Sequence, residues 1–225
     1  MLKTISFLLK FIFPSHCIQC KTEGDFLCKS CEEKYFVTNK KQVCPISYLP
    51  SVHGRTLDNY KNKTSLDGLL VLSSYKKNNI LQKLLKKLKY YFAFDIANTL
   101  GNILNKFLNQ QGFPKKEFCI TYVPLHWKRK SYRVFNQSKL LSEKIGETKK
   151  LLNRVKHTPQ QAKLNRNERL NNLKNAFEFV GKEMPEKVLI VDDVASTCTT
   201  LNECAKVLKA SGAKEVWGIV LARNI

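Results

Sequence analysis

Apolar residues recur along this chain with two different spacings. Short continuous runs, at Leu69–Tyr75, Phe118–Val123 and Val188–Val191, are typical of strands covered on both faces of a sheet. Between the first two runs, apolar residues at every third or fourth position of 80–88 alternate with lysines, which predicts a helix with one apolar face. Strands that alternate with helices favour an α/β fold built on a parallel sheet.

The same patterns predict the remaining elements. We expect helices over about 93–110, from 133–137 to about 147, and over Leu201–Ser211, and a last strand at Glu215–Ala222. Gly212 follows the third helix, where glycine commonly ends a helix. The polar, amide-rich stretch 158–177 predicts a lid or substrate hood, and a solvated insertion is the alternative.

Two segments bear on domain organisation and location. Residues 45–68, with their prolines, glycines and polar residues, mark a border between predicted domains 1–60 and 61–225. Residues 2–13 are apolar but include two lysines, whereas a membrane-spanning helix needs about 20 apolar residues. We expect this segment to form a helix on its own domain, with contact to a membrane surface as the alternative. The expected location is cytoplasmic, at most peripheral at the inner membrane.

Four of the eight cysteines form two C-x2-C pairs, Cys17 with Cys20 and Cys28 with Cys31. Two such pairs can complete a tetrahedral zinc site, whereas disulfides are disfavoured in a reducing cytosol. A closed site of four thiolates predicts a structural Zn²⁺ ion, and redox pairing is the alternative. Cys44, with Ser47 where a third pair would end, and His16 are weaker ligand candidates.

Paired acids and a run of hydroxyls follow the third apolar run. Asp192 and Asp193 stand where we expect the strand to end, so that both carboxylates can face one ligand. Hydroxyls and the free N–H groups of a helix start donate to phosphate, and carboxylates accept hydrogen bonds from vicinal ribose hydroxyls. The hydroxyls here are Ser196, Thr197, Thr199 and Thr200. This pattern predicts a site for a phosphorylated ribose; metal-dependent phosphoryl transfer would explain the acids but not the hydroxyls.

Charge adds a second class of ligand. The chain has 39 Lys and Arg against 18 Asp and Glu, a net charge of +21, which attracts polyanions such as nucleic acid. A lysine-rich proteome is the alternative, but it does not explain the shortage of acids. Basic and aromatic residues lie together in 76–94, which suits single-stranded DNA, and core burial is the alternative for some of the rings. The candidate DNA-binding residues are Lys86, Lys87, Lys89, Tyr90, Arg133 and Arg169.

The segment from Asp192 to Thr200 resembles the loop of type I phosphoribosyltransferases that binds 5-phosphoribosyl-1-pyrophosphate (PRPP). More narrowly, the chain resembles the ComF/GntX family of competence-associated, phosphoribosyltransferase-like proteins, in which a cysteine-rich zinc module precedes the PRPP domain. Two further stretches carry this resemblance: Arg133-Val134-Phe135-Asn136-Gln137, and the spaced residues Gln161, Leu164, Arg169, Asn172 and Phe177.

The resemblance implies a type I phosphoribosyltransferase fold, a mostly parallel sheet flanked by helices, with a smaller hood and a small N-terminal zinc-binding module. Asp192 and Asp193 would be catalytic and hold the ribose hydroxyls, while His126, Lys128 and Arg129 would approach the pyrophosphate with Mg²⁺ bridging. The 5-phosphate would be held by Ala195, Ser196, Thr197, Cys198, Thr199 and Thr200. The implied partners are PRPP, single-stranded DNA and other DNA-uptake proteins at the inner membrane face.

Two positions depart from the family pattern. Cys198 and Val134 stand where the family usually has glycine, which permits positive φ and close backbone approach, so both bear on phosphate geometry and turnover. The first functional hypothesis is a competence protein that binds PRPP, and binds single-stranded DNA during natural transformation. The alternative is an active phosphoribosyltransferase in nucleotide metabolism. No residue identifies its small-molecule acceptor, so the sequence leaves open whether the chain is an enzyme.

Overall fold

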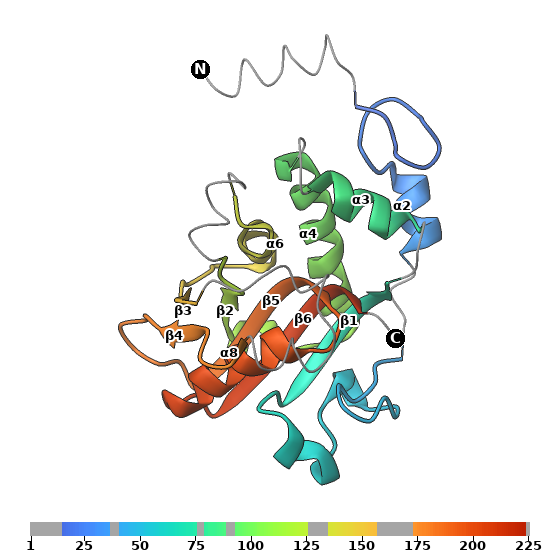
Figure 1. Cartoon of the computed structure of the whole chain (residues 1–225). Coiled ribbons are helices and arrows are strands. Elements are labelled where there is room, and N and C mark those ends of the chain that lie inside the picture. The colour runs from blue at the N-terminus through green and yellow to red at the C-terminus, as the bar shows by residue number, and fades with distance from the viewer. Residues whose placement is uncertain are drawn as a thin grey trace.

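Four parallel strands form the centre of the protein, in the order β1-β6-β5-β2 (Figure 1). The computed structural model describes residues 15–36, 41–75, 79–88, 93–125, 135–156 and 173–223. The strands of this sheet are β1 (Gly68–Ser74), β2 (Cys119–Tyr122), β5 (Lys187–Ala195) and β6 (Glu215–Arg223). A separate antiparallel ribbon joins β3 (Leu152–Arg154) to β4 (Phe177–Phe179).

Helices cover both faces of the parallel sheet (Figure 1). The α-helices of the described residues are α2 (Lys29–Tyr35), α3 (Ile80–Leu88), α4 (Ala93–Gln110), α6 (Gln137–Ile145) and α8 (Thr199–Ala210). Short 3-10 helices occupy Val52–Gly54, Asp58–Lys63 and Lys115–Glu117. The parallel α/β architecture expected from the alternation of strands and helices is confirmed.

The two faces of the sheet follow the alternation of side chains along each strand. In β5, Leu189 and Val191 pack in one cluster with residues of α3, α4 and α6. Val188 and Ile190 pack in a second cluster with residues of α8 and of the β3–β4 ribbon. Since β5 is buried from both sides, its sequence is a continuous apolar run, as predicted.

Helix α3 confirms the predicted apolar stripe. Its isoleucine and four leucines are all buried, whereas Lys83, Lys86 and Lys87 are exposed. The predicted bounds of α4 are also confirmed. Helix α8 begins and ends within about two residues of the prediction. Helix α6 ends about two residues before the predicted end, and it begins at the last residue of the predicted start, 133–137.

The cysteine-rich segment shares a core with the helical layer. Cys17, Phe26 and Leu27 belong to the same buried cluster as the leucines of α3 and α4. At its surface, Lys106 of α4 lies 3.5 Å from a carboxylate oxygen of Glu32. The border between domains 1–60 and 61–225 stays a prediction. The cysteine-rich segment, however, packs against the helical layer and so does not depend on a core of its own for its stability.

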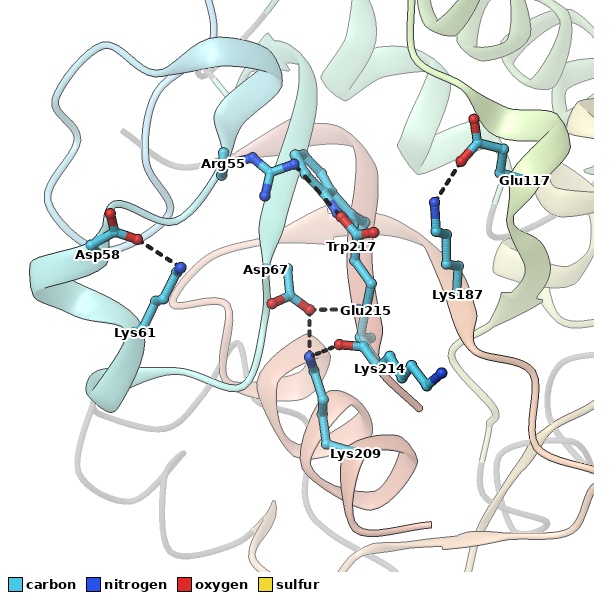
Figure 2. A network of polar contacts seen from close by, with 11 residues as sticks. Arg55, Asp58, Lys61, Asp67, Glu117, Lys187, Lys209, Lys214, Glu215 and Trp217 are labelled. Atoms are coloured by element: carbon cyan, nitrogen blue, oxygen red, sulfur yellow. Dashed lines mark hydrogen bonds and ion pairs between the residues drawn. The ribbon is translucent and has the colours of Figure 1, made fainter. Parts of the chain in front are cut away.

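Asp67 organises the amino end of the sheet (Figure 2). Its Oδ2 accepts a hydrogen bond from the backbone N–H of Val216 at 2.6 Å and lies 2.7 Å from the Nζ of Lys209. The same Nζ donates to the carbonyl oxygen of Lys214 at 2.6 Å. One carboxylate therefore joins the start of β1 to the start of β6 and to the end of α8.

One strand boundary was predicted wrongly. Strand β5 does not end at Asp192, because Val194 and Ala195 continue to pair with Ala222 and Arg223 of β6. The helix predicted for residues 2–13 lies outside the described residues, as does 157–172, which holds most of the predicted lid.

Candidate metal centre and candidate ligand loop

The four cysteines of the two C-x2-C pairs converge. The Sγ atoms of Cys17, Cys20, Cys28 and Cys31 all lie within 4.8 Å of one another, and those of Cys20 and Cys28 are 3.5 Å apart. A tetrahedral zinc ion with Zn–S bonds of about 2.3 Å separates its sulfur ligands by about 3.8 Å, so the cluster fits this ion. The prediction that these four residues can hold a metal is confirmed.

Local backbone geometry brings the two pairs together. The first pair lies in a turn in which Lys21 donates its N–H to the Cys17 carbonyl at 3.0 Å, with Lys21 at φ 66°. In the second pair, Cys28 precedes the first residue of α2 and Cys31 lies in its first turn. This turn and this helix start point all four thiols at one position.

The thiols of the cluster differ in acidity. Hydrogen bonds from the Thr22 hydroxyl and backbone lower the pKa of Cys20 to about 6, whereas burial and the neighbouring thiols raise the pKa of Cys31 to about 12. A cation among the four sulfurs would favour every thiolate, since zinc ligands are deprotonated. Cys44 is fully buried and is not part of the cluster, and His16 is exposed and does not belong to it either.

The carboxyl end of β5 carries the acidic pair. Asp192 Oδ1 accepts hydrogen bonds from the Ser138 hydroxyl at 2.8 Å and from the N–H of Asp193 at 2.9 Å. Asp193 Oδ1 accepts from the N–H of Val194 at 2.7 Å. Val191 and Val194, three residues apart, pack against the same cluster, so the alternation of faces is interrupted at the acidic pair. Of the two acids, Asp192 lines the small pocket of the loop that follows β5, whereas Asp193 is not among the residues that line it.

The pKa of Asp192 is raised to about 7, mainly by burial and then by the charge of Asp193. The Ser138 hydrogen bond and the positive charge of Arg154 oppose this shift. Two neighbouring carboxylates that are costly to ionise together are suited to a ligand that brings a cation or hydroxyl donors.

The loop that follows β5 is lined by hydroxyls. A small pocket is formed by Asp192, Val194 and residues 195–201, which include the six residues predicted to hold the 5-phosphate. The hydroxyls of Thr197 and Thr199 lie 2.8 Å apart. Thr199 and Thr200 belong to the first turn of α8, where backbone N–H groups have no partner within the helix. Hydroxyls and N–H groups therefore converge on one small pocket, which suits an anion.

Cys198 adopts the conformation for which the family uses glycine. Its φ is 57° and its ψ is 3°, in the left-handed region, directly before α8. Its side chain is buried in the same cluster as Leu201 and Cys204. The loop thus keeps the backbone turn that a glycine would make, at the cost of a strained cysteine.

The predictions missed three side chains at this site. Ser138 of α6 binds Asp192, and Arg154 of β3 is buried near it. Asn202 of α8 accepts hydrogen bonds from the Thr64 hydroxyl and the Ser65 N–H, both at 2.8 Å, and ties the segment before β1 to the loop. Arg154 lies two residues after buried Leu152 in a strand, so it faces the same side, and this spacing could have indicated an inward-facing arginine. No comparable pattern in the sequence points to Asn202.

The remaining predicted site residues belong to another helix or lie outside the described residues. Lys86 and Lys87 are on α3, and the Nζ of Lys87 lies 5.9 Å from the ring centroid of Phe26 in the cysteine-rich segment. Outside the described residues are Lys89, Tyr90, His126, Lys128, Arg129, Arg133, Val134 and Arg169. Among the described helices, none has the length and apolar character needed to cross a membrane.

Comparison with known proteins gives relatives along most of the chain. Competence protein F of Haemophilus influenzae is 32% identical over 233 residues, covering 93% of this chain and 98% of the relative. The chain belongs to the ComF family. Competence protein ComFC of Streptococcus pneumoniae is 33% identical over 59% of this chain and 60% of its own length. DNA utilization protein YhgH of Salmonella typhi is 30% identical, with 88% of this chain and 91% of the relative covered. No family model matches the chain.

Membership of the ComF family confirms the resemblance on which the fold was predicted. Since the match with the Haemophilus protein covers almost the whole chain, the family assignment applies to the cysteine cluster as well as to the β5–α8 loop. The parallel sheet flanked by helices and the cysteine module at its amino-terminal side are the two parts that the family was expected to combine.

Proposed function

We propose that this protein binds PRPP at the β5–α8 loop and handles single-stranded DNA during DNA uptake. The observation that carries the proposal is the end of β5 with the loop after it, where two adjacent carboxylates lie near the carboxyl end of a parallel strand and hydroxyls line the start of a helix. The names of the relatives, which are competence proteins and DNA utilization proteins, support the role in DNA uptake.

The ribose and the 5-phosphate of PRPP would find matching groups at this loop. Asp192 and Asp193 would accept hydrogen bonds from the two ribose hydroxyls, while the hydroxyls and N–H groups of residues 196–200 would donate to the 5-phosphate. Mg²⁺ bound with PRPP would neutralise the pyrophosphate. Because it would also favour the ionised form of the acidic pair, PRPP should bind better above pH 7 than below it.

Charge supports the DNA part of the proposal. A net charge of +21 gives a strong attraction for phosphodiesters, and Lys86 and Lys87 are exposed on α3. The cysteine-rich segment packs beside that helix and would keep it in place when zinc is bound. DNA affinity should therefore fall steeply with salt concentration, since each neutralised phosphate releases counterions.

A titration of single-stranded DNA, with and without Mg–PRPP, tests both parts. We expect binding of a labelled oligonucleotide that weakens with salt, and saturable binding of PRPP that is lost in Asp192→Ala. Asp58→Ala is the matched control, because Asp58 is an exposed acid at the other end of the sheet. Absence of PRPP binding would refute the loop assignment, and DNA binding that is absent or independent of salt would refute the DNA assignment.

A second candidate is an active phosphoribosyltransferase. It is favoured by the left-handed conformation of Cys198, which preserves the glycine-type turn of the loop. In that reaction the C1–O bond to pyrophosphate breaks as an acceptor nucleophile bonds to C1 of the ribose. Release of pyrophosphate from Mg–PRPP, measured with candidate acceptors and abolished in Asp192→Ala, would support it. PRPP binding without acceptor-dependent pyrophosphate release would favour the binding module.

A further inference from the structure

Two aromatic rings form an exposed pair at the junction of α4 and α6. Phe94, in the first turn of α4, has 62% of its surface exposed. Its ring centroid lies 5.8 Å from that of Phe135, with the two planes inclined at 52°. Phe135 is partly buried and stands just before α6. A partly buried ring therefore lies against a second ring that faces solvent.

Hydrogen bonds connect the segment that follows Phe135 to Asp192 at the carboxyl end of β5. Asn136, the next residue, accepts from the N–H groups of Ser138 and Lys139 and donates its Nδ2 to the carbonyl of Val123 at the end of β2. Ser138 in turn donates to Asp192. The start of α6, which follows Phe135 directly, is therefore linked by hydrogen bonds to the end of β2 and to Asp192 of β5.

The two helices that carry the rings are in close contact. A Cβ placed on Gly101 of α4 would lie 2.7 Å from the Cβ of Lys144 in α6, so only glycine permits this approach. Such packing fixes the relative position of the helix starts. A rigid aromatic pair loses little conformational entropy on binding a flat ligand.

The charge of the protein indicates the kind of flat ligand. The protein carries a net charge of +21, and the helix that precedes α4 exposes Lys83, Lys86 and Lys87. Nucleobases stack on aromatic rings with little dependence on sequence, while lysines contact the phosphates that link them. An exposed ring in a strongly basic protein is complementary to an unpaired base on a polyanion.

We propose that Phe94 and Phe135 form a stacking platform for a base of single-stranded DNA beside the β5–α8 loop. The inference rests on the proposed handling of single-stranded DNA and adds where a base is held.

The test compares two oligonucleotides of equal length, one of thymidines and one fully abasic, which keeps the phosphates but has no bases. Phe94→Leu keeps an apolar side chain without a ring, and Phe94→Trp keeps a ring. We expect the Leu variant to bind the thymidine oligonucleotide roughly 5–30-fold more weakly and the abasic one within about 2-fold of the wild-type chain. The Trp variant should bind both like the wild-type chain, or bind the thymidine oligonucleotide more tightly.

Two further kinds of outcome would contradict either the stacking platform alone or the proposed DNA function as well. An unchanged thymidine affinity in Phe94→Leu, or an equal loss for both oligonucleotides, would refute the stacking platform alone. The midpoint of thermal unfolding of each variant serves as the measure of intact folding. If the wild-type chain bound neither oligonucleotide, the proposed DNA function and the platform would both be wrong.

Discussion

Asp192 is the residue whose protonation the fold changes most clearly. Burial and the neighbouring Asp193 raise its pKa to about 7, from an ordinary value of 3.8 in the unfolded chain. The folded state therefore binds a proton more tightly than the unfolded state. Between about pH 4 and pH 7 this difference lowers the stability of the ligand-free protein as pH rises, and above pH 7 the full cost is present.

Asp192→Asn should therefore stabilise the ligand-free protein at high pH. The amide oxygen can still accept the Ser138 hydrogen bond, but it carries no charge to desolvate. We expect a gain of about 1–3 kcal/mol in unfolding free energy at pH 8 and a much smaller one at pH 5, measured by urea denaturation. Asp58→Asn, in an exposed ion pair, should show no such gain. Equal effects at both pH values would contradict the assignment.

Individual residues also show where the sequence was informative and where it was not. The run of hydroxyls and the two cysteine pairs are local patterns, and each converges as predicted because neighbours in sequence stay neighbours in a turn. Ser138 and Arg154 act on Asp192 from other elements, Ser138 by a hydrogen bond and Arg154 by its charge. The spacing of Arg154 from Leu152 indicates that it faces inward, but no local pattern shows which acid either residue meets. Cys198 was correctly singled out as a glycine position, but the sequence did not reveal that cysteine would adopt the same left-handed turn.

At the scale of elements, alternation predicted the strands and helices better than it predicted their ends. Strand β5 was expected to stop at the acidic pair, because two adjacent side chains cannot face one ligand from a regular strand. The structure instead keeps the strand paired with β6 and interrupts the alternation locally, with side-chain oxygens of both acids accepting backbone N–H groups. Tertiary pairing, which depends on a distant strand, decided the boundary.

Asp67 provides a test of how the elements are joined at the amino end of the sheet (Figure 2). Asp67→Ala would leave the N–H of buried Val216 without its partner and remove the contact with Lys209. We expect a loss of about 1–3 kcal/mol in unfolding free energy, measured by chemical denaturation. In Asp58→Ala, the control in the same region, the lost partner is an exposed lysine, so stability should hardly change. A similar effect of both variants would contradict the role of Asp67.

For the molecule as a whole, the cysteine cluster is part of the main core. Cys17 and Cys31 lie in the buried cluster that also contains the leucines of α3 and α4. A metal ion that fixes the four thiolates would therefore stabilise the helical layer as well as the short segment that supplies them. Loss of the ion should be felt beyond residues 15–36.

Cys20→Ser should accordingly lower both metal content and thermal stability. We expect the purified wild-type chain to hold one zinc ion and the variant to lose it, with a midpoint of thermal unfolding lower by about 5–10 °C. Cys119→Ser, at a partly buried cysteine outside the cluster, is the control and should keep its zinc. Metal content is measured by mass spectrometry of the native protein. An unaltered zinc content in Cys20→Ser would contradict the site.

The position of β6 has a consequence for how the chain is made. This strand follows all the other described elements in sequence, yet it lies between β1 and β5 in the sheet. During synthesis β1 and β5 emerge first, each with an open edge that can pair with another chain. The ligand loop follows β5, and the end of β5 pairs with β6. The loop can therefore reach its final position only after β6 has been synthesised. A chain interrupted before residue 215 would lose the middle of its sheet, and the product would be prone to aggregate.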